Sequence, residues 1–181
     1  MAKNAADHPA LILASSSPRR SELLRQVGVD FRVVVADVDE SVHPGEAPAD
    51  YVLRVARDKV LTVQRREACA LPVLGADTTV VLDGRILGKP DDRAGAAAML
   101  ACLSGRTHEV YSAVALARGP RGVDHRLNVT RVTFAQLEPG WIEAYIDTGD
   151  PMDKAGAYGV QGRAAAKIVR MPNWAAHSVP S

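Results

Sequence analysis

Apolar runs of strand length alternate with stretches of helical periodicity along this chain. The run at 10–14 (ALILA) predicts a buried strand, and a helical pattern follows it as far as Gly28. Further strands are predicted over 31–38 and 71–76, a hairpin over 79–87, and two long strands over 107–117 and 123–136. Helices are predicted over 49–66, 91–103 and 138–147. Early alternation followed by a long hairpin indicates an α/β fold with a mixed sheet.

The composition is that of an ordinary globular protein. The chain has 181 residues, of which 47% are hydrophobic and 24% charged, so it can bury a core as one domain or as two small lobes. Its formal charge of +1 and its 4% of aromatic residues argue against a nucleic-acid-binding module, which needs a basic excess and stacking platforms.

We expect a soluble, cytoplasmic protein. Neither Cys69 nor Cys102 has a second cysteine or a histidine at metal-binding spacing, which favours reduced thiols. No apolar stretch reaches the length of a membrane span, and the first residues lack the core of a signal peptide.

A serine-rich junction with two arginines connects the first predicted strand to the first helix (Ser15-Ser16-Ser17-Pro18-Arg19-Arg20). Ser17 is expected to cap the helix, with Pro18 as its first residue. Arg19 and Arg20 then fall in the first turn, where the helix dipole disfavours each cation by roughly 0.3–1 kcal/mol. Cations, backbone N–H groups and hydroxyls at one helix start are typical of an anion site, although arginines that merely point to solvent are the alternative.

Four further charged residues occupy positions that suggest a ligand. Lys59 falls on the apolar stripe of its predicted helix, so it either extends to solvent or lies at a cleft. Asp77 follows the third apolar run, at the carboxyl end of a predicted strand, where open α/β sheets bind ligands. Glu40 also follows a predicted strand, and the two carboxylates could hold a hard divalent cation, although acids at strand ends are commonly only solvated. Lys89, in a Gly-Lys-Pro sequence, is a weaker candidate.

The segment 149–162 is rich in glycine and has neither a helix period nor strand alternation. A stretch of this length predicts a functional loop, with a structured turn as the alternative. Its small residues allow the backbone to approach a ligand closely, while Asp153, Lys154 and Gln161 can supply polar contacts. It does not have the pattern of a Walker A loop.

Together these blocks resemble the Maf family of nucleoside triphosphate pyrophosphatases over roughly 11–162. The matching blocks are Ser15-Ser16-Ser17-Pro18-Arg19-Arg20, Ala56-Arg57-Asp58-Lys59, Gly75-Ala76-Asp77-Thr78, Gly88-Lys89-Pro90, Ser104-Gly105-Arg106-Thr107-His108 and the segment from Asp153 to Gly162. The resemblance implies a single Maf-like domain over 1–181. It also implies a two-lobed α/β fold, similar to inosine triphosphatase-like enzymes, with the active site in the central cleft.

The resemblance further implies an activity, the hydrolysis of nucleoside triphosphates to the monophosphate and pyrophosphate. A divalent metal cation, Mg²⁺ or Mn²⁺, would be the cofactor. By this analogy Asp77 accepts the proton of the attacking water, and Glu40 and Asp77 hold the metal. The groups that bind the triphosphate would be Ser17, Arg19, Arg20, Lys59 and Lys89.

The glycine-rich block looks like that of the family branch acting on dTTP, UTP and modified uridine triphosphates. Arg20, Thr78 and Gln161 would then select the base. The branch acting on 7-methyl-GTP, and a nucleotide-binding regulator of septum formation with little turnover, are the alternatives.

The expected partner is the nucleoside triphosphate substrate, with neither nucleic acid nor membrane, and a homodimer is left open. The segment 163–181 departs from the family pattern, because it lacks a Gly-Leu-Pro stretch and a closing helix.

Overall fold

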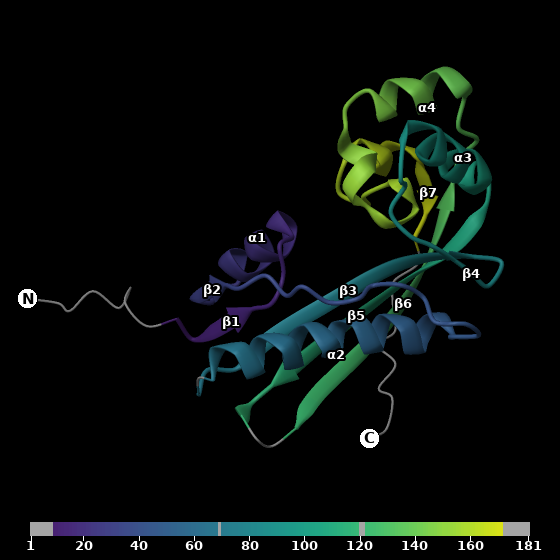
Figure 1. The fold of residues 1–181 in the computed structure, drawn as a ribbon. Coiled ribbons are helices and arrows are strands. Elements are labelled where there is room, and N and C mark those ends of the chain that lie inside the picture. The colour runs from purple at the N-terminus through teal and green to yellow at the C-terminus, as the bar shows by residue number, and fades with distance from the viewer. Residues whose placement is uncertain (1–8, 69, 120–121, 172–181) are drawn as a thin grey trace, which may run out of the picture. The chain divides into compact units, whose positions relative to one another are not determined.

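The computed structural model describes residues 9–68, 70–119 and 122–171 (Figure 1). Within these residues, seven strands form one mixed sheet flanked by helices, which confirms the predicted fold class. The elements in chain order are β1 (Leu11–Leu13), α1 (Pro18–Gln26), β2 (Phe31–Val33), α2 (Pro48–Glu67), β3 (Val73–Leu82), β4 (Arg85–Leu87), α3 (Arg93–Leu103), β5 (Thr107–Ala117), β6 (Val123–Phe134), α4 (Pro139–Ile146) and β7 (Ile168–Arg170). Short 3-10 helices at Asp150–Asp153, Ala155–Ala157 and Arg163–Lys167 connect α4 to β7.

The sheet has the strand order β2-β1-β3-β5-β6-β7, with β4 paired to β3. β1 runs parallel to both β2 and β3, whereas the β3–β4 and β6–β7 pairs are antiparallel. The parallel ladder is short, because β1 ends at Leu13, whose partners are Val33 and Leu74. β3 continues well past this point, so Asp77 lies just beyond the end of the parallel ladder.

The described residues cluster into two compact units. The first takes the chain up to Asp77 together with 113–127, and the second takes 78–112 together with the residues from Asn128 on. In the first unit, α2 buries an apolar face of valines and alanine, as its helical period predicts (Val52, Val55, Ala56, Val60 and Val63). In the second, α3 and α4 contribute Leu100 and Tyr145 to a core that includes Phe134.

Gly75 allows α2 to lie close to β3. A Cβ atom at this position would come within 2.7 Å of Val60 Cγ2 and 2.9 Å of the Ala56 carbonyl oxygen. Both distances are shorter than real Cβ contacts, so no larger residue fits without a shift of the helix.

Two predicted strands differ from those observed. The strand predicted over 31–38 ends at Val33. Its neighbour β1 ends at Leu13, whose carbonyl accepts from the Val34 N–H at 3.0 Å, and β1 has no further residues with which 35–38 could pair. The strand at 71–76 and the first arm of the hairpin are one continuous strand, β3. A polar residue, Asp77, seemed to interrupt this strand, but its side chain is buried within it.

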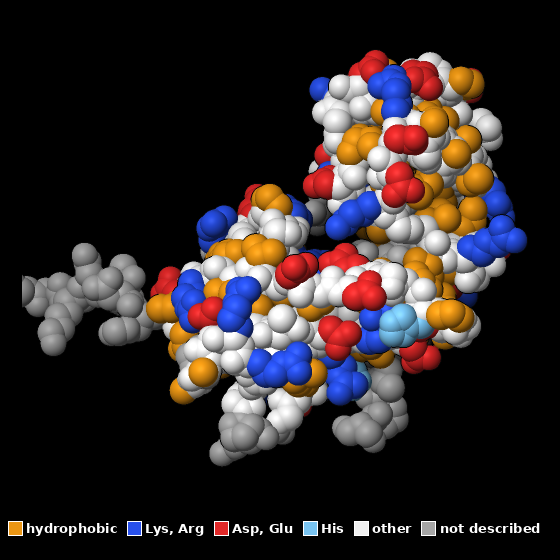
Figure 2. Space-filling view, in the orientation of Figure 1, with side chains coloured by type: hydrophobic (Ala, Val, Ile, Leu, Met, Phe, Trp, Pro, Cys, Tyr) orange, Lys and Arg blue, Asp and Glu red, His pale blue; other side chains and the backbone are white. Residues whose placement is uncertain are grey.

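No helix in the described part of the chain combines the length and the apolar character that a membrane crossing requires. On the face drawn in Figure 2, basic and acidic side chains are interspersed.

Candidate active site

The segment between β1 and α1 is organised by the hydroxyl of Ser15. Ser17 is the N-cap residue of α1 and Pro18 its first residue, as predicted, but the Ser17 side chain caps no N–H among the described residues. Instead, the Ser17 N–H donates to the Ser15 hydroxyl at 3.2 Å, and Arg20 Nη1 donates to the same oxygen at 3.1 Å. Ser15 is buried, and sequence reasoning did not single it out, since nothing distinguishes one serine of three in a row.

Arg19 and Arg20, which the sequence paired, diverge in the structure. Arg19 Nη1 lies 2.9 Å from Glu22 Oε2 in an exposed ion pair along α1. Burial lowers the pKa of Arg20, while the charges of Asp77 and Glu40 act in the opposite direction. An arginine remains protonated at neutral pH in either case, so Arg20 is a permanent positive charge near these two acids.

Lys59 lies between two carboxylates. Its Nζ is 2.8 Å from Asp77 Oδ1 and also 2.8 Å from Glu40 Oε1. The residue is 7% exposed and belongs to the apolar face of α2, so of the two alternatives left open by the sequence, extension to solvent is not observed. Gly75, two residues before Asp77 on β3, allows α2 to approach closely, and this brings Lys59 next to β3.

Asp77 is a buried carboxylate inside β3, with 7% of its surface exposed. The prediction that it ends a strand is wrong, although it does lie beyond the carboxyl end of the neighbouring β1. Burial raises the pKa of Asp77, while the ammonium of Lys59 and the charge of Arg20 oppose this effect. A carboxyl with a raised pKa is a stronger base than an exposed aspartate.

Glu40 does not follow a strand directly, contrary to the prediction, because β2 ends at Val33 and the chain from there to α2 has neither helix nor strand. The residue reaches the cluster from this long connection. Among the residues the structure describes, no group of three or more His, Cys, Asp or Glu side chains could hold a metal ion. Glu40 and Asp77 therefore form a pair of carboxylates around one cation rather than a complete metal cage.

Three predicted site residues belong to the second unit, whereas the cluster at Asp77 belongs to the first. Thr78 is exposed on the face of β3 opposite to Asp77, since neighbours alternate along a strand, and its hydroxyl lies 3.3 Å from that of Ser112. Lys89 is exposed after β4, and Gln161 is exposed in a turn between two 3-10 helices. The structure does not assign these three residues a ligand.

The comparisons with known proteins identify the family. The model of the Maf-like protein family matches residues 10–178. The chain belongs to the Maf family. A relative from Methylobacillus flagellatus, named dTTP/UTP pyrophosphatase, is 51% identical over 162 residues, which cover 89% of this chain and 81% of the relative. A second, from Symbiobacterium thermophilum and of the same name, is 57% identical over 159 residues, covering 87% and 80%.

Solved structures give a looser similarity. The Ham1 protein of Staphylococcus aureus matches with a TM-score of 0.47 and 14% identity, over 87% of this chain and 90% of that one.

Two blocks of the Maf resemblance meet inside the second unit. The ring nitrogen Nε2 of His108 lies 2.5 Å from the hydroxyl of Tyr158, and both rings contact Phe134 edge to face. Burial lowers the pKa of His108 to about 4, so the ring is neutral at physiological pH. Tyr158 thus anchors the segment that carries Gln161, with its hydroxyl engaged by His108.

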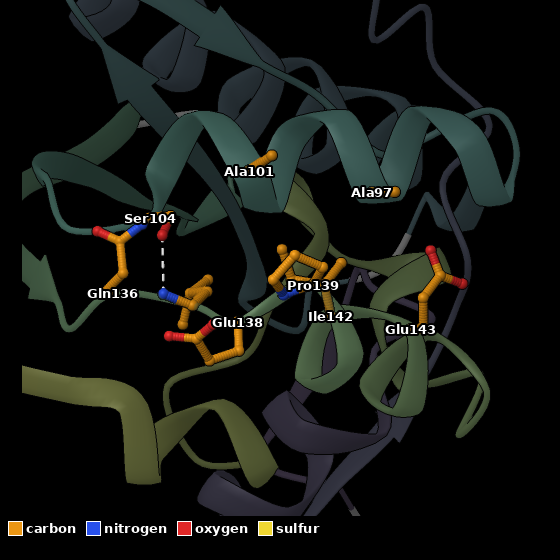
Figure 3. Close-up of a pocket in the computed structure, with 9 residues that line it drawn as sticks. Ala97, Ala101, Ser104, Gln136, Glu138, Pro139, Ile142 and Glu143 are labelled. Atoms are coloured by element: carbon orange, nitrogen blue, oxygen red, sulfur yellow. Dashed lines mark hydrogen bonds between the residues drawn. The ribbon is translucent and has the colours of Figure 1, made fainter.

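A hollow of about 350 Å³ in the second unit has a different character (Figure 3). It lies between α3 and the start of α4, where the Ser104 hydroxyl accepts a hydrogen bond from the Leu137 N–H at 2.7 Å. Its charged lining residues are Glu138 and Glu143, without a lysine or arginine. Such a hollow repels polyphosphates, so it does not compete with the cluster at Asp77 as a phosphate site in this Maf protein.

Proposed function

We propose that this chain hydrolyses nucleoside triphosphates, including dTTP, UTP and modified pyrimidine triphosphates, to the monophosphate and pyrophosphate. Membership of the Maf family supports this, as do relatives at 51% and 57% identity that are named dTTP/UTP pyrophosphatase. The observation that carries the proposal is the buried Asp77 carboxylate, whose pKa is raised and which has Lys59 at 2.8 Å. A protein that only binds nucleotides needs no such base beside the phosphates.

Asp77 is the general base in this mechanism. Its carboxylate accepts the proton of a water molecule that attacks the α-phosphorus, and the bond to the leaving pyrophosphate breaks. The raised pKa brings its basicity closer to neutral pH, where general bases work best. Lys59 has three N–H donors. Two of them point at Glu40 and Asp77, so the third can donate to a phosphate oxygen.

The charge of the cluster argues for a divalent cation. Arg20 and Lys59 are balanced by Glu40 and Asp77, so these four side chains alone do not offset the negative charge of a triphosphate. Glu40 and Asp77 both contact the Lys59 ammonium, and two carboxylates this close together fit Mg²⁺, which is bound by one or two carboxylates, waters and substrate phosphates. Glu40 and Asp77 would hold this metal, Mg²⁺ or Mn²⁺, which when bound supplies Lewis-acid stabilisation of charge on phosphate oxygens.

The start of α1 offers further groups that can bind phosphate. The N-terminal N–H groups of α1 and Ser17 offer neutral donors to an anion. Arg19 can contribute after leaving its exposed pair with Glu22, which costs little because such pairs are worth only about 0–1 kcal/mol. By the resemblance to the Maf family, Lys89 would also bind phosphate, and Arg20, Thr78 and Gln161 would select the base.

The test is a panel of nucleoside triphosphates with Mg²⁺, in which release of pyrophosphate and of orthophosphate is scored separately. We expect pyrophosphate from UTP and dTTP, and no release after the metal is chelated. Orthophosphate as the first product would contradict the proposal. Tight binding without turnover would favour a nucleotide-binding regulator, and preference for 7-methyl-GTP would favour the other family branch.

The variant Asp77→Asn should lower kcat by about 10²–10⁴-fold, the usual contribution of a general base, while the thermal melting temperature changes little. Asp124→Asn is the matched control, because Asp124 lies in the same unit and pairs with Arg118 in an exposed ion pair. Near-wild-type turnover in Asp77→Asn would remove Asp77 from the mechanism.

A further inference from the structure

Glu40 lies in a connection that is itself neither helix nor strand. The chain from 34 to 47 has neither helix nor strand, and the Glu40 side chain is 40% exposed. A carboxylate used in catalysis or metal binding must be held within about 0.5 Å of its working position. The ion pair with Lys59 holds the end of the Glu40 side chain, whereas the position of its main chain depends on contacts made elsewhere in the connection.

Two side chains of α2, one turn apart, hold three successive carbonyl groups around Glu40. The Tyr51 hydroxyl donates to the Glu40 carbonyl at 3.0 Å. Arg54 donates to the Ser41 carbonyl at 2.8 Å through Nη2 and approaches the Asp39 carbonyl at 3.5 Å through Nη1. Residues three apart on a helix share one face, which explains how Tyr51 and Arg54 reach the same segment.

The far end of the same connection is held by Arg54 as well. Its guanidinium binds both oxygens of the Glu46 carboxylate, at 2.6 Å through Nε and 2.9 Å through Nη2. Glu46 in turn accepts from the His43 N–H at 3.0 Å. The bidentate pair holds the pKa of Glu46 down at about 2, so this contact persists across the physiological pH range. One arginine therefore connects both sides of the turn that follows Glu40.

We propose that Tyr51 and Arg54 are positioning residues that fix the main chain at Asp39–Ser41. They thereby present the Glu40 carboxylate to the divalent metal ion that Glu40 and Asp77 would hold. This inference rests on the proposed function, because it takes Glu40 to be a metal-holding residue. Helix α2 then fixes Glu40 twice, by its main chain through Tyr51 and Arg54 and by its carboxylate through Lys59.

Tyr51→Phe is the sharpest variant, since it removes one hydroxyl and keeps a ring that is 8% exposed. Arg54→Lys keeps the charge but loses the planar fork that spans Ser41 and Glu46. Arg66→Ala is the matched control, because Arg66 also lies on α2 and donates to a carbonyl of the same connection, that of Val35 at 3.1 Å. It removes a comparable contact away from Glu40.

Two measurements do not need turnover. Hydrogen–deuterium exchange should be faster at the Ser41 and His43 amides in Tyr51→Phe and Arg54→Lys than in wild type. Titration with Mn²⁺ alone should show about 10–100-fold weaker binding, the usual effect of losing a partner that orients a metal ligand. The Mg²⁺ concentration for half-maximal pyrophosphate release should rise in parallel, while Arg66→Ala changes neither metal measurement.

Several results would overturn the inference. Unchanged exchange at both amides would show that the contacts do not hold the segment, and faster exchange with unchanged Mn²⁺ affinity would show that the contacts serve the fold alone. Absence of Mn²⁺ binding to the wild type would also overturn it. If the wild type binds Mn²⁺ but releases no pyrophosphate from any triphosphate, the proposed function fails, and the Mn²⁺ titration of the variants still decides the role of Tyr51 and Arg54.

Discussion

At the scale of single residues, Lys59 is the most informative position. A buried ammonium loses much of its hydration, and its two contacts at 2.8 Å compensate for that loss only in part. Replacing a buried ion pair by apolar residues of similar volume is often neutral or stabilising, so such a cluster is a poor device for stability. Its presence in the core face of α2 is better explained by the chemistry of Asp77 than by the needs of the fold.

His108 gives the molecule a defined dependence of stability on pH. Its pKa is about 4 in the folded state, below the ordinary value of 6.5, because burial disfavours the charged ring. Below pH 6.5 the unfolded chain takes up a proton that the folded chain excludes. The free energy of unfolding should therefore be highest above pH 6.5 and should fall by up to ~3 kcal/mol as the pH approaches 4.

Urea unfolding between pH 4 and 7 measures this effect. His108→Gln should remove most of the slope of the unfolding free energy against pH. His43→Gln, at an exposed loop position, should leave this slope unchanged. The same slope in wild type and His108→Gln would mean that another group is responsible.

At the scale of elements, the packing of α2 on β3 determines whether Lys59 can reach Asp77. Gly75→Ala places a methyl group against the Ala56 carbonyl, which cannot move without the helix. We expect a loss of about 1–3 kcal/mol in stability, typical of overpacking, and a lower kcat because α2 moves away from β3. The control is Gly140→Ala in α4, where an added Cβ meets nothing within 4 Å. Thermal melting and pyrophosphate release check both variants, and a Gly75→Ala protein with normal stability and kcat would contradict this role of α2.

Substitutions at the start of α1 should show that its two arginines, Arg19 and Arg20, have different roles. Arg20→Ala should lower kcat/KM for UTP by about 10–100-fold, the value of one charge-assisted hydrogen bond. Arg19→Ala should have a smaller effect, because Arg19 already pairs with Glu22. Neither should reduce the melting temperature much, since both cations oppose the dipole at a helix start. Arg25→Ala, in the last turn of the same helix, is the control, and it should affect stability rather than kinetics. A larger kinetic loss in Arg19→Ala than in Arg20→Ala would reverse the assignment.

Local periodicity made the helices and Lys59 predictable, because a 3.6-residue repeat shows which face of α2 is buried. The interruption expected at Asp77 was wrong for a non-local reason, since an acid is tolerated inside a strand when a partner such as Lys59 reaches it from another element. The location of Glu40 depends on Tyr51 and Arg54, whose contacts join residues 11 to 15 positions apart through an irregular connection. No periodic pattern describes such a connection, which is why these two residues were not among the predicted site residues.

At the scale of the whole molecule, the property to explain is which side chains select the substrate base. Gln161 is the strongest candidate, because a side-chain amide offers both a donor and an acceptor and so can match the edge of a uracil or thymine ring. It lies in the segment of the second unit that the His108–Tyr158 hydrogen bond anchors.

Gln161→Ala should therefore reduce the preference for UTP and dTTP over CTP and the purine triphosphates more than it lowers kcat on UTP. A site built to pair with a base rejects bases that leave its polar groups without partners, and removing the amide removes that penalty. Values of kcat/KM across the nucleotide panel give the measure, with Gln26→Ala on the exposed face of α1 as the control. An unchanged preference in Gln161→Ala would transfer base selection to Thr78 and Arg20. A uniform loss on all substrates would instead mean that Gln161 contributes to binding without reading the base.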